Sequence, residues 1–145
     1  MIRPYKKEDK NQLLDILKKN APTYFDPNEI EDFEAYLIQN QSTYLTLEHD
    51  SKIVGGAGYF VNSNDRSGRV TWIFFHPDYT QLGLGTNVMN HCLKLLKSDA
   101  RVEKLVVTTS QLAFRFFEKF GYELQQVEKD HWGPGLDLYL MERQL

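Results

Sequence analysis

Apolar positions in the first third of the chain follow a helical spacing. Between Leu13 and Leu17 they recur as on one face of a helix, so a short opening strand is expected to lead into an amphipathic helix. A second helix is predicted to begin at Asp26, because aspartate can cap a helix and Glu29 stands three residues later, as in a capping box. Residues 20–25 then form an ordered loop between the two helices.

The rest of the chain is predicted to alternate strands and helices. From Thr43 to Phe75, β-branched and aromatic residues are interrupted by turn-forming stretches at residues 49–51 and 62–68, which indicates a three-stranded meander. Pro77 ends this meander, because proline cannot donate a hydrogen bond to a sheet. The elements expected after it are a helix over residues 84–96, a buried strand over 105–108, a helix over 113–120 that stops at Gly121, and two last strands around 122–127 and 136–141.

These elements describe one α/β or α+β domain over residues 1–145. Helices interleaved with a meander and a later strand–helix–strand unit form a mixed sheet covered by helices on both faces. The length of 145 residues suits one compact domain, and no repeat, low-complexity tract or linker divides it. The composition, 41% hydrophobic and 26% charged, is that of a globular protein that folds autonomously.

The charge and the cysteine content narrow the classes of partner. The net charge of -3 argues against nucleic acid, because it provides no long-range attraction to phosphate backbones. The longest apolar runs are far below the ~18 residues that cross a bilayer, so no membrane partner is expected. Cys92 is the only cysteine, and the first residues lack the apolar stretch of an export signal, which predicts a cytoplasmic protein. We expect no metal cofactor, and the oligomeric state stays open between a monomer and a homodimer.

A glycine-containing turn between a strand and an amphipathic helix carries the candidate chemistry. Around Gly83 and Gly85, such a turn would present consecutive main-chain N–H groups and the positive end of a helix to an anion. A side chain at either position would block close approach of the backbone or forbid a positive φ. The two glycines can equally serve only to end a strand and start a helix. A Walker loop and a dinucleotide-binding turn are disfavoured, because no Gly-Lys-Ser/Thr follows and Val88 replaces the third glycine.

Two longer segments resemble a known family. Residues 76–86, His-Pro-Asp-Tyr-Thr-Gln-Leu-Gly-Leu-Gly-Thr, look like motif A of the GNAT acetyltransferase superfamily, and residues 110–122 are similar to its motif B. Residues 2–9 resemble its usual first strand and helix, so the resemblance covers essentially the whole chain. It implies a mixed, mostly antiparallel central sheet of about six to seven strands. It also implies acetyl-coenzyme A as cosubstrate, in a cleft where the strand ending near Phe75 splays from the strand over residues 105–109.

The resemblance assigns residues to this cosubstrate by matched position. Main-chain groups of Phe74 and Phe75 would pair with the pantetheine arm, and Ser110 and Phe117 would border the pantetheine and the thioester. The pyrophosphate would be held by backbone amides of Gln81, Leu82, Gly83, Leu84, Gly85 and Thr86.

Two positions depart from the family pattern. Thr80 stands where the family's motif begins with Gln or Arg, and Gln81 comes one step late. Phe117 stands where many members carry a tyrosine thought to protonate the departing thiolate. Phenylalanine has no hydroxyl and cannot act as an acid.

The chemistry also requires a group that takes a proton from the acceptor. A lysine-like amine with a pKa near ~10.4 is neutral in only about one in a few thousand molecules at pH 7, so a base or a water relay must help. The candidate bases are His76, Asp130, His131 and Glu128, and the sequence does not select among them. Tyr79, Tyr122 and Tyr139 are candidate substitute acids, although each can equally be a packing residue.

The acceptor is expected to bind between the loop over residues 20–26, the second helix and the segment over residues 128–136. Tyr24, Phe25 and Trp132 are the aromatic candidates for binding it, and acidic residues of the second helix would suit a cationic amine. The acidic residues expected on this side are Asp26, Glu29, Glu31, Asp32 and Glu34. The same acidic residues also fit the solvated face of an amphipathic helix.

We therefore predict an N-acetyltransferase that transfers an acetyl group from acetyl-CoA to a primary amine of a small molecule or peptide. The alternative is a GNAT-like module that senses acyl-CoA without turnover, which the missing acid at Phe117 favours. A third hypothesis is a domain whose exposed aromatic residues only bind a partner.

Overall fold

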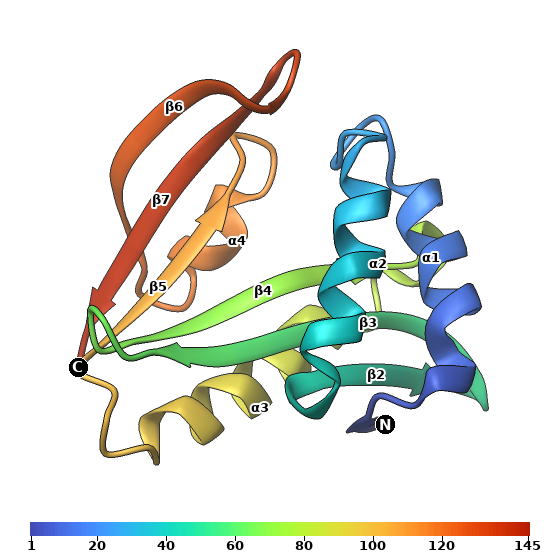
Figure 1. Ribbon diagram of the computed structural model, residues 1–145, viewed down its shortest axis with the longest axis horizontal. Coiled ribbons are helices and arrows are strands. Elements are labelled where there is room, and N and C mark those ends of the chain that lie inside the picture. The colour runs from blue at the N-terminus through green and yellow to red at the C-terminus, as the bar shows by residue number, and fades with distance from the viewer.

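A single sheet of seven strands runs through the computed structural model, which describes residues 1–145 (Figure 1). The strand order in the sheet is β1-β2-β3-β4-β5-β7-β6. The strands are β1 (Ile2–Pro4), β2 (Tyr44–His49), β3 (Lys52–Asn62), β4 (Ser67–Phe75), β5 (Lys104–Thr109), β6 (Glu123–Gly133) and β7 (Leu136–Gln144). The helices are α1 (Lys10–Lys19), α2 (Glu29–Gln39), α3 (Leu84–Lys97) and α4 (Phe114–Glu118), with short 3-10 turns at Lys7–Asp9, Gln41–Thr43 and Pro77–Tyr79.

The sheet is antiparallel except at one junction. β4 and β5 are parallel neighbours, and they pair only from Ser67 to Arg69 on β4 and from Lys104 to Val106 on β5. Beyond these residues the two strands diverge, as Figure 1 shows. The predicted mixed, mostly antiparallel sheet is therefore confirmed, and its one parallel junction opens into a gap.

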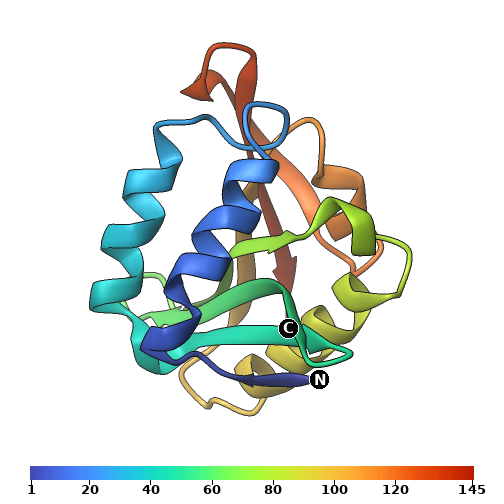
Figure 2. The same cartoon turned by 90° about the vertical axis from the view of Figure 1, so that its right-hand side faces the viewer.

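Helices cover both faces of the sheet, as predicted (Figures 1 and 2). On one face, α1 and α2 bury a core of nine residues that includes the rings of Phe33, Tyr44 and Phe74. On the other face, α3 and α4 contribute to a larger core of 16 buried residues, among them Met89 and Leu105. Both cores pack side chains from β2 and β4. On β2, Tyr44 and Leu45 face opposite sides because successive residues of a strand alternate. On β4, Val70 and Phe74 face opposite sides because a β-bulge between them shifts the alternation by one residue.

The predicted hairpin turns are present, but three element boundaries were wrong. The second helix, α2, begins at Glu29 instead of Asp26, because residues 27 and 28 form a turn before it. β6 continues to Gly133 instead of ending near residue 127. It is an edge strand with almost every side chain exposed, so no apolar alternation marks its second half. The helix α4 is shorter than predicted, because its last turn is closed by 3-10 bonds from the Phe120 N–H to the Phe117 carbonyl and from the Gly121 N–H to the Glu118 carbonyl.

Candidate active site

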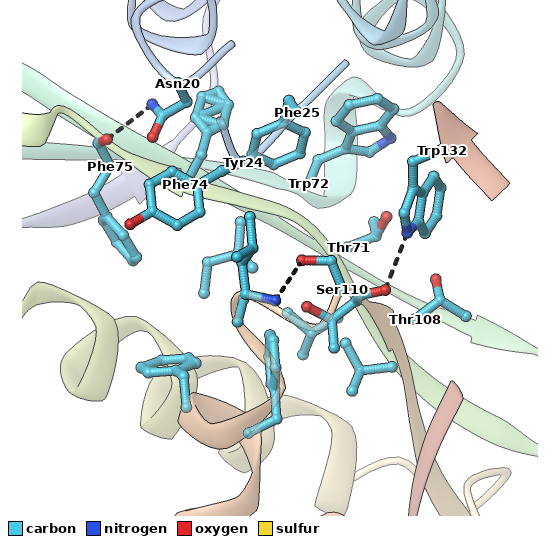
Figure 3. A pocket seen from close by; sticks show the side chains of 18 of the residues that line it. Asn20, Tyr24, Phe25, Thr71, Trp72, Phe74, Phe75, Thr108, Ser110 and Trp132 are labelled. Carbon is cyan, nitrogen blue, oxygen red and sulfur yellow. Dashed lines mark hydrogen bonds between the residues drawn. The ribbon is translucent and has the colours of Figure 1, made fainter. Parts of the chain in front are cut away.

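A cleft of about 420 Å³ opens where β4 and β5 diverge (Figure 3). Its walls are the second half of β4, the end of β5, the start and middle of α4, the loop between α1 and α2, and Trp132 from the hairpin between β6 and β7. This is the place in which the sequence predicted a cosubstrate cleft. Segments that are far apart in the chain meet here because the sheet splits instead of closing.

A β-bulge on β4 shapes the floor of the cleft. Gly56 pairs with Phe74 and Gly58 pairs with Thr71, so two residues of β4 stand opposite one residue of β3. At the bulge Trp72 has a φ of 48°, a backbone conformation that is an outlier for a bulky side chain. The main-chain carbonyl of Trp72 accepts a hydrogen bond of 2.8 Å from the Tyr44 hydroxyl, which holds the bulge in place. Bulges re-aim side chains at active sites, and here Trp72 lines the cleft.

Beyond the bulge, the main chain of Phe75 faces the cleft. The His76 N–H donates to the Val54 carbonyl at 2.7 Å, and hydrogen-bonded pairs alternate along an antiparallel ladder. The peptide groups of Phe75 therefore point away from β3, while those of Phe74 point towards it. The Phe75 carbonyl already accepts a hydrogen bond of 3.0 Å from the Asn20 side-chain amide, which leaves its N–H as the free group.

The turn before α3 presents a row of unused main-chain donors. None of the N–H groups of residues 81–86 donates a hydrogen bond to the main chain or to a side chain. They lie at the N-terminus of a helix of 14 residues, where the helix dipole adds a partial positive charge. This arrangement fits an anionic group such as a pyrophosphate.

The two glycines of the turn are needed for different physical reasons. Gly83 has a φ of 71°, and a side chain added there would meet open space, so the backbone conformation is what requires glycine. At Gly85 a Cβ atom would lie 2.8 Å from the ring of Phe116, so the close packing of α3 on α4 requires glycine there. The prediction of a positive φ therefore holds for Gly83 and not for Gly85.

Ser110 and Phe117 border the cleft on the side of α4. The Ser110 hydroxyl accepts a hydrogen bond of 3.2 Å from the Leu112 N–H and so stabilises the turn before the helix. Phe117 is 2% exposed and packs edge-to-face against Phe116 and Tyr122, with ring centroids 5.0 and 5.9 Å away. Of the tyrosines predicted as substitute acids, Tyr79, Tyr122 and Tyr139, none lines the cleft.

The bases proposed from the sequence do not line the cleft either. His76 Nδ1 accepts a hydrogen bond of 3.1 Å from the Asp78 N–H, and its ring packs on Tyr79. Asp130 accepts a hydrogen bond of 2.7 Å from the Gly135 N–H and thereby shapes the β6–β7 hairpin. On the same exposed hairpin, His131 Nδ1 lies 3.2 Å from Glu128 Oε2. The catalytic roles of these residues remain predictions.

Glu29 is the one carboxylate that lines the cleft, and the sequence did not single it out as a base. Its side chain accepts a hydrogen bond of 2.8 Å from the Asp26 N–H, which is one of the two hydrogen bonds of the predicted capping box. The other is replaced, because the Asp26 carboxylate accepts from the Asn28 N–H and not from the Glu29 N–H. Glu29 is 8% exposed, and burial raises the pKa of its carboxyl from 4.5 to about 7, helped by the nearby charges of Asp26 and Asp32. The spacing of Asp26 and Glu29 in the sequence indicated that Glu29 lies at the start of a helix, but it did not indicate that the Glu29 side chain is buried.

The loop between α1 and α2 lies beside the β6–β7 hairpin (Figure 2). A Cβ atom on Gly133 would collide with the side chain of Asp26, so the two segments are in direct contact. Trp132 Nε1 donates a hydrogen bond of 3.0 Å to the Thr109 carbonyl, which ties the hairpin to the end of β5. The predicted acceptor residues Tyr24, Phe25 and Trp132 are thus brought together, since all three line the cleft.

Comparison with known proteins identifies the family. Residues 10–122 match the Acetyltransferase (GNAT) family. The chain belongs to this family. The resemblance seen in residues 76–86 and 110–122 is therefore confirmed.

Two archaeal relatives align with nearly the whole of this GNAT chain. The N-alpha-acetyltransferase of Sulfurisphaera tokodaii is 25% identical, over 97% of this chain and 90% of the relative. The N-alpha-acetyltransferase of Saccharolobus solfataricus is also 25% identical, over 99% of this chain and 92% of the relative.

Solved structures show the same fold. Ribosomal-protein-alanine N-acetyltransferase from Brucella melitensis matches with a TM-score of 0.79 at 17% identity, over 100% of this chain and 99% of that one. Aminoglycoside 6'-N-acetyltransferase complexed with coenzyme A matches with a TM-score of 0.76 at 16% identity, over 99% of this chain and 96% of that one. At these identities the likeness establishes the fold alone.

Of the predicted anion-binding turn, only the preceding residue Thr80 lines the cleft, and the free main-chain donors of residues 81–86 follow it directly in the chain. The buried carboxyl of Glu29 lines the cleft together with the aromatic residues Tyr24, Phe25 and Trp132. None of the helices combines the length and the apolar composition needed to pass through a bilayer.

Proposed function

We propose that this chain is an acetyl-CoA-dependent N-acetyltransferase that acts on a primary amine of a small molecule or peptide. The observation that carries the proposal is the row of unpaired N–H groups at the start of α3, next to the cleft between β4 and β5. Membership of the GNAT family supports the transfer of an acetyl group. The solved neighbours named as complexes with coenzyme A or with acetyl-CoA support the identity of the donor.

The turn over residues 81–86 fits the pyrophosphate, which is a charged part of the cosubstrate. Main-chain donors of residues 81–86 would hold the pyrophosphate, and Gly83 keeps the turn open to it. The free N–H of Phe75 would pair with the pantetheine arm, while Ser110 and Phe117 border the arm from α4. Acetyl-CoA supplies an activated thioester when it is bound.

We assign Glu29 as the general base that removes a proton from the acceptor amine. With a pKa of about 7 it is half ionised near neutral pH, which is the range in which a general base works best. It would take the proton from the amine directly or through one water molecule. The amine nitrogen forms the new bond to the acetyl carbon, the carbon–sulfur bond breaks, and coenzyme A leaves as a thiolate. Because a thiol has a pKa of about 8.5, this leaving group is stable without an acid at Phe117.

A thiol-release assay with acetyl-CoA and a panel of amines tests the function. We expect amine-dependent release with the wild type, and a kcat about 10²- to 10⁴-fold lower for Glu29→Gln, because glutamine cannot accept the proton. Glu31→Gln is the matched control, since Glu31 is an exposed carboxylate in the first turn of the same helix. His131→Ala tests one of the bases proposed from the sequence. If Glu29 is the base, the kcat of this variant should fall by less than about tenfold.

The alternative is a sensor that binds acyl-CoA without turnover, and the phenylalanine at position 117 favours it. Saturable binding of acetyl-CoA with no amine-dependent thiol release from any member of the panel would support the sensor. Robust turnover with one amine would eliminate it.

A further inference from the structure

The charge of the cleft lining limits the acceptors that it can hold. Of the 20 residues that line the cleft, 13 are hydrophobic and only Glu29 has a carboxylate or a basic side chain. One ammonium group on an acceptor can therefore be neutralised inside the cleft. A second charged group would lose its hydration without gaining a partner, which is costly in an apolar environment.

The acidic residues around the cleft do not change this balance. Glu31 and Asp32 are exposed on α2, and neither lines the cleft. Asp26 is buried, but its carboxylate accepts a hydrogen bond of 3.0 Å from the Asn28 N–H and packs against Gly133. The cleft thus offers a single anionic site for an amine.

The acceptor end of the cleft is also lined by aromatic rings. The rings of Phe25 and Trp72 are nearly parallel, with an angle of 12° between their planes and 6.2 Å between their centroids. Trp132 has its only polar atom engaged by the Thr109 carbonyl, so its ring contributes apolar surface to the cleft. In Figure 3 the rings of Phe25, Trp72 and Trp132 form a row along one side of the cleft. Such a wall favours planar groups, which gain stacking contacts in addition to burial.

We propose that the acceptor is a primary amine borne by a flat apolar group, most simply an arylalkylamine, with no second charge near the amine. This inference rests on the proposed function and specifies its substrate class. The ammonium group would lie at Glu29 and the planar group against Phe25, Trp72 and Trp132. The same chemistry occurs in a free arylalkylamine and in a peptide that begins with phenylalanine.

Steady-state acetylation of matched amines tests the class. With acetyl-CoA saturating, we expect kcat/KM for 2-phenylethylamine to exceed that for 1,5-diaminopentane by at least about tenfold, because the diamine brings a second charge and no ring. Tripeptide amides that begin with phenylalanine or lysine distinguish a peptide source from a small-molecule source. Equal or greater kcat/KM for the diamine, or for the peptide that begins with lysine over the one that begins with phenylalanine, would overturn the proposal.

A binding measurement tests the class independently of turnover. The two tryptophans of the chain, Trp72 and Trp132, both line the cleft, so tryptophan fluorescence reports directly on its occupancy. With coenzyme A bound, 2-phenylethylamine should change this fluorescence saturably and at lower concentration than 1,5-diaminopentane. The variants Trp72→Phe and Trp132→Phe each retain one reporter ring and should both respond.

The two measurements separate failure of this inference from failure of the proposed function. If acetyl-CoA binds and no amine is acetylated, the enzymatic function fails, and the fluorescence titration still decides the ligand class. If the diamine binds more tightly, or if neither amine binds, the inference is refuted whatever the turnover. In Phe25→Leu, the ratio of kcat/KM for the aromatic amine to that for the diamine should fall severalfold, and an unchanged ratio would argue against the aromatic wall.

Discussion

Replacing Glu29 by glutamine should change the stability of the protein in a way that depends on pH. Glutamine keeps an oxygen that can accept the hydrogen bond from the Asp26 N–H, so this bond is preserved. What the substitution removes is a carboxyl whose pKa is about 7 in the folded protein and about 4.5 in the unfolded chain. The comparison of the two proteins therefore isolates the cost of burying this ionisable group.

The sign of the effect follows from the two pKa values. Well below pH 4.5 the carboxyl of Glu29 is protonated in both states and does not affect stability. Between 4.5 and about 7 the unfolded chain loses the proton while the folded protein retains it, so the free energy of unfolding of the wild type falls as the pH rises. The shift corresponds to about 3 kcal/mol, which solvent at the cleft mouth reduces to about 2 kcal/mol.

Urea denaturation followed by circular dichroism provides the measurement. Near pH 4.5 the wild type and Glu29→Gln should have similar free energies of unfolding, and at about pH 8 the variant should be more stable by about 2 kcal/mol. Glu31→Gln, on the exposed side of the same helix, should stay within about 0.5 kcal/mol of the wild type at both pH values. A stability difference for Glu29→Gln that does not change with pH would refute the argument that Glu29 titrates near neutral pH.

Three further predictions concern other parts of the chain. Gly85→Val should destabilise the protein by about 1 to 3 kcal/mol in urea denaturation, because its Cβ would overlap the Phe116 ring; an unchanged midpoint would contradict this packing. Gly83→Glu should leave the circular dichroism spectrum unchanged, because a side chain there meets open space, and should lower the affinity for acetyl-CoA at least about a hundredfold, because it strains the positive-φ turn and adds negative charge beside the proposed pyrophosphate position; retained affinity would show that the pyrophosphate lies elsewhere. Burial raises the pKa of the Cys92 thiol to about 12, so the folded protein should resist a thiol reagent that labels the unfolded chain rapidly, and equally fast labelling of both would contradict the burial.

The geometry of the turn before α3 was predictable from the sequence because its parts are local. The strand, the turn with Gly83 and the helical spacing from Leu84 to Leu96 are adjacent in the chain, so one short segment indicates how the turn is built. The hydrogen bond from the Asp26 N–H to the Glu29 side chain was predictable for the same reason, since it joins residues three positions apart.

The burial of Glu29 and the shape of the aromatic end of the cleft depend on contacts between distant segments. Glu29 is buried partly because the β6–β7 hairpin brings Gly133 onto Asp26, and no local pattern indicates that contact. The direction of the Trp72 side chain depends on a β-bulge, which exists only when β3 and β4 pair. In the same way, the side-chain amide of Asn20 donates a hydrogen bond to the Phe75 carbonyl across 55 residues of chain. The sequence could therefore not indicate which main-chain group of Phe75 is free.

Calorimetric titration of the wild-type protein with acetyl-CoA tests the central claim most directly. We predict saturable binding of one molecule per chain, with Gly83→Glu as the variant in which it is lost. No heat of binding at about millimolar acetyl-CoA, which corresponds to less than about 4 kcal/mol of binding free energy, would contradict the assignment of the turn before α3 to the pyrophosphate.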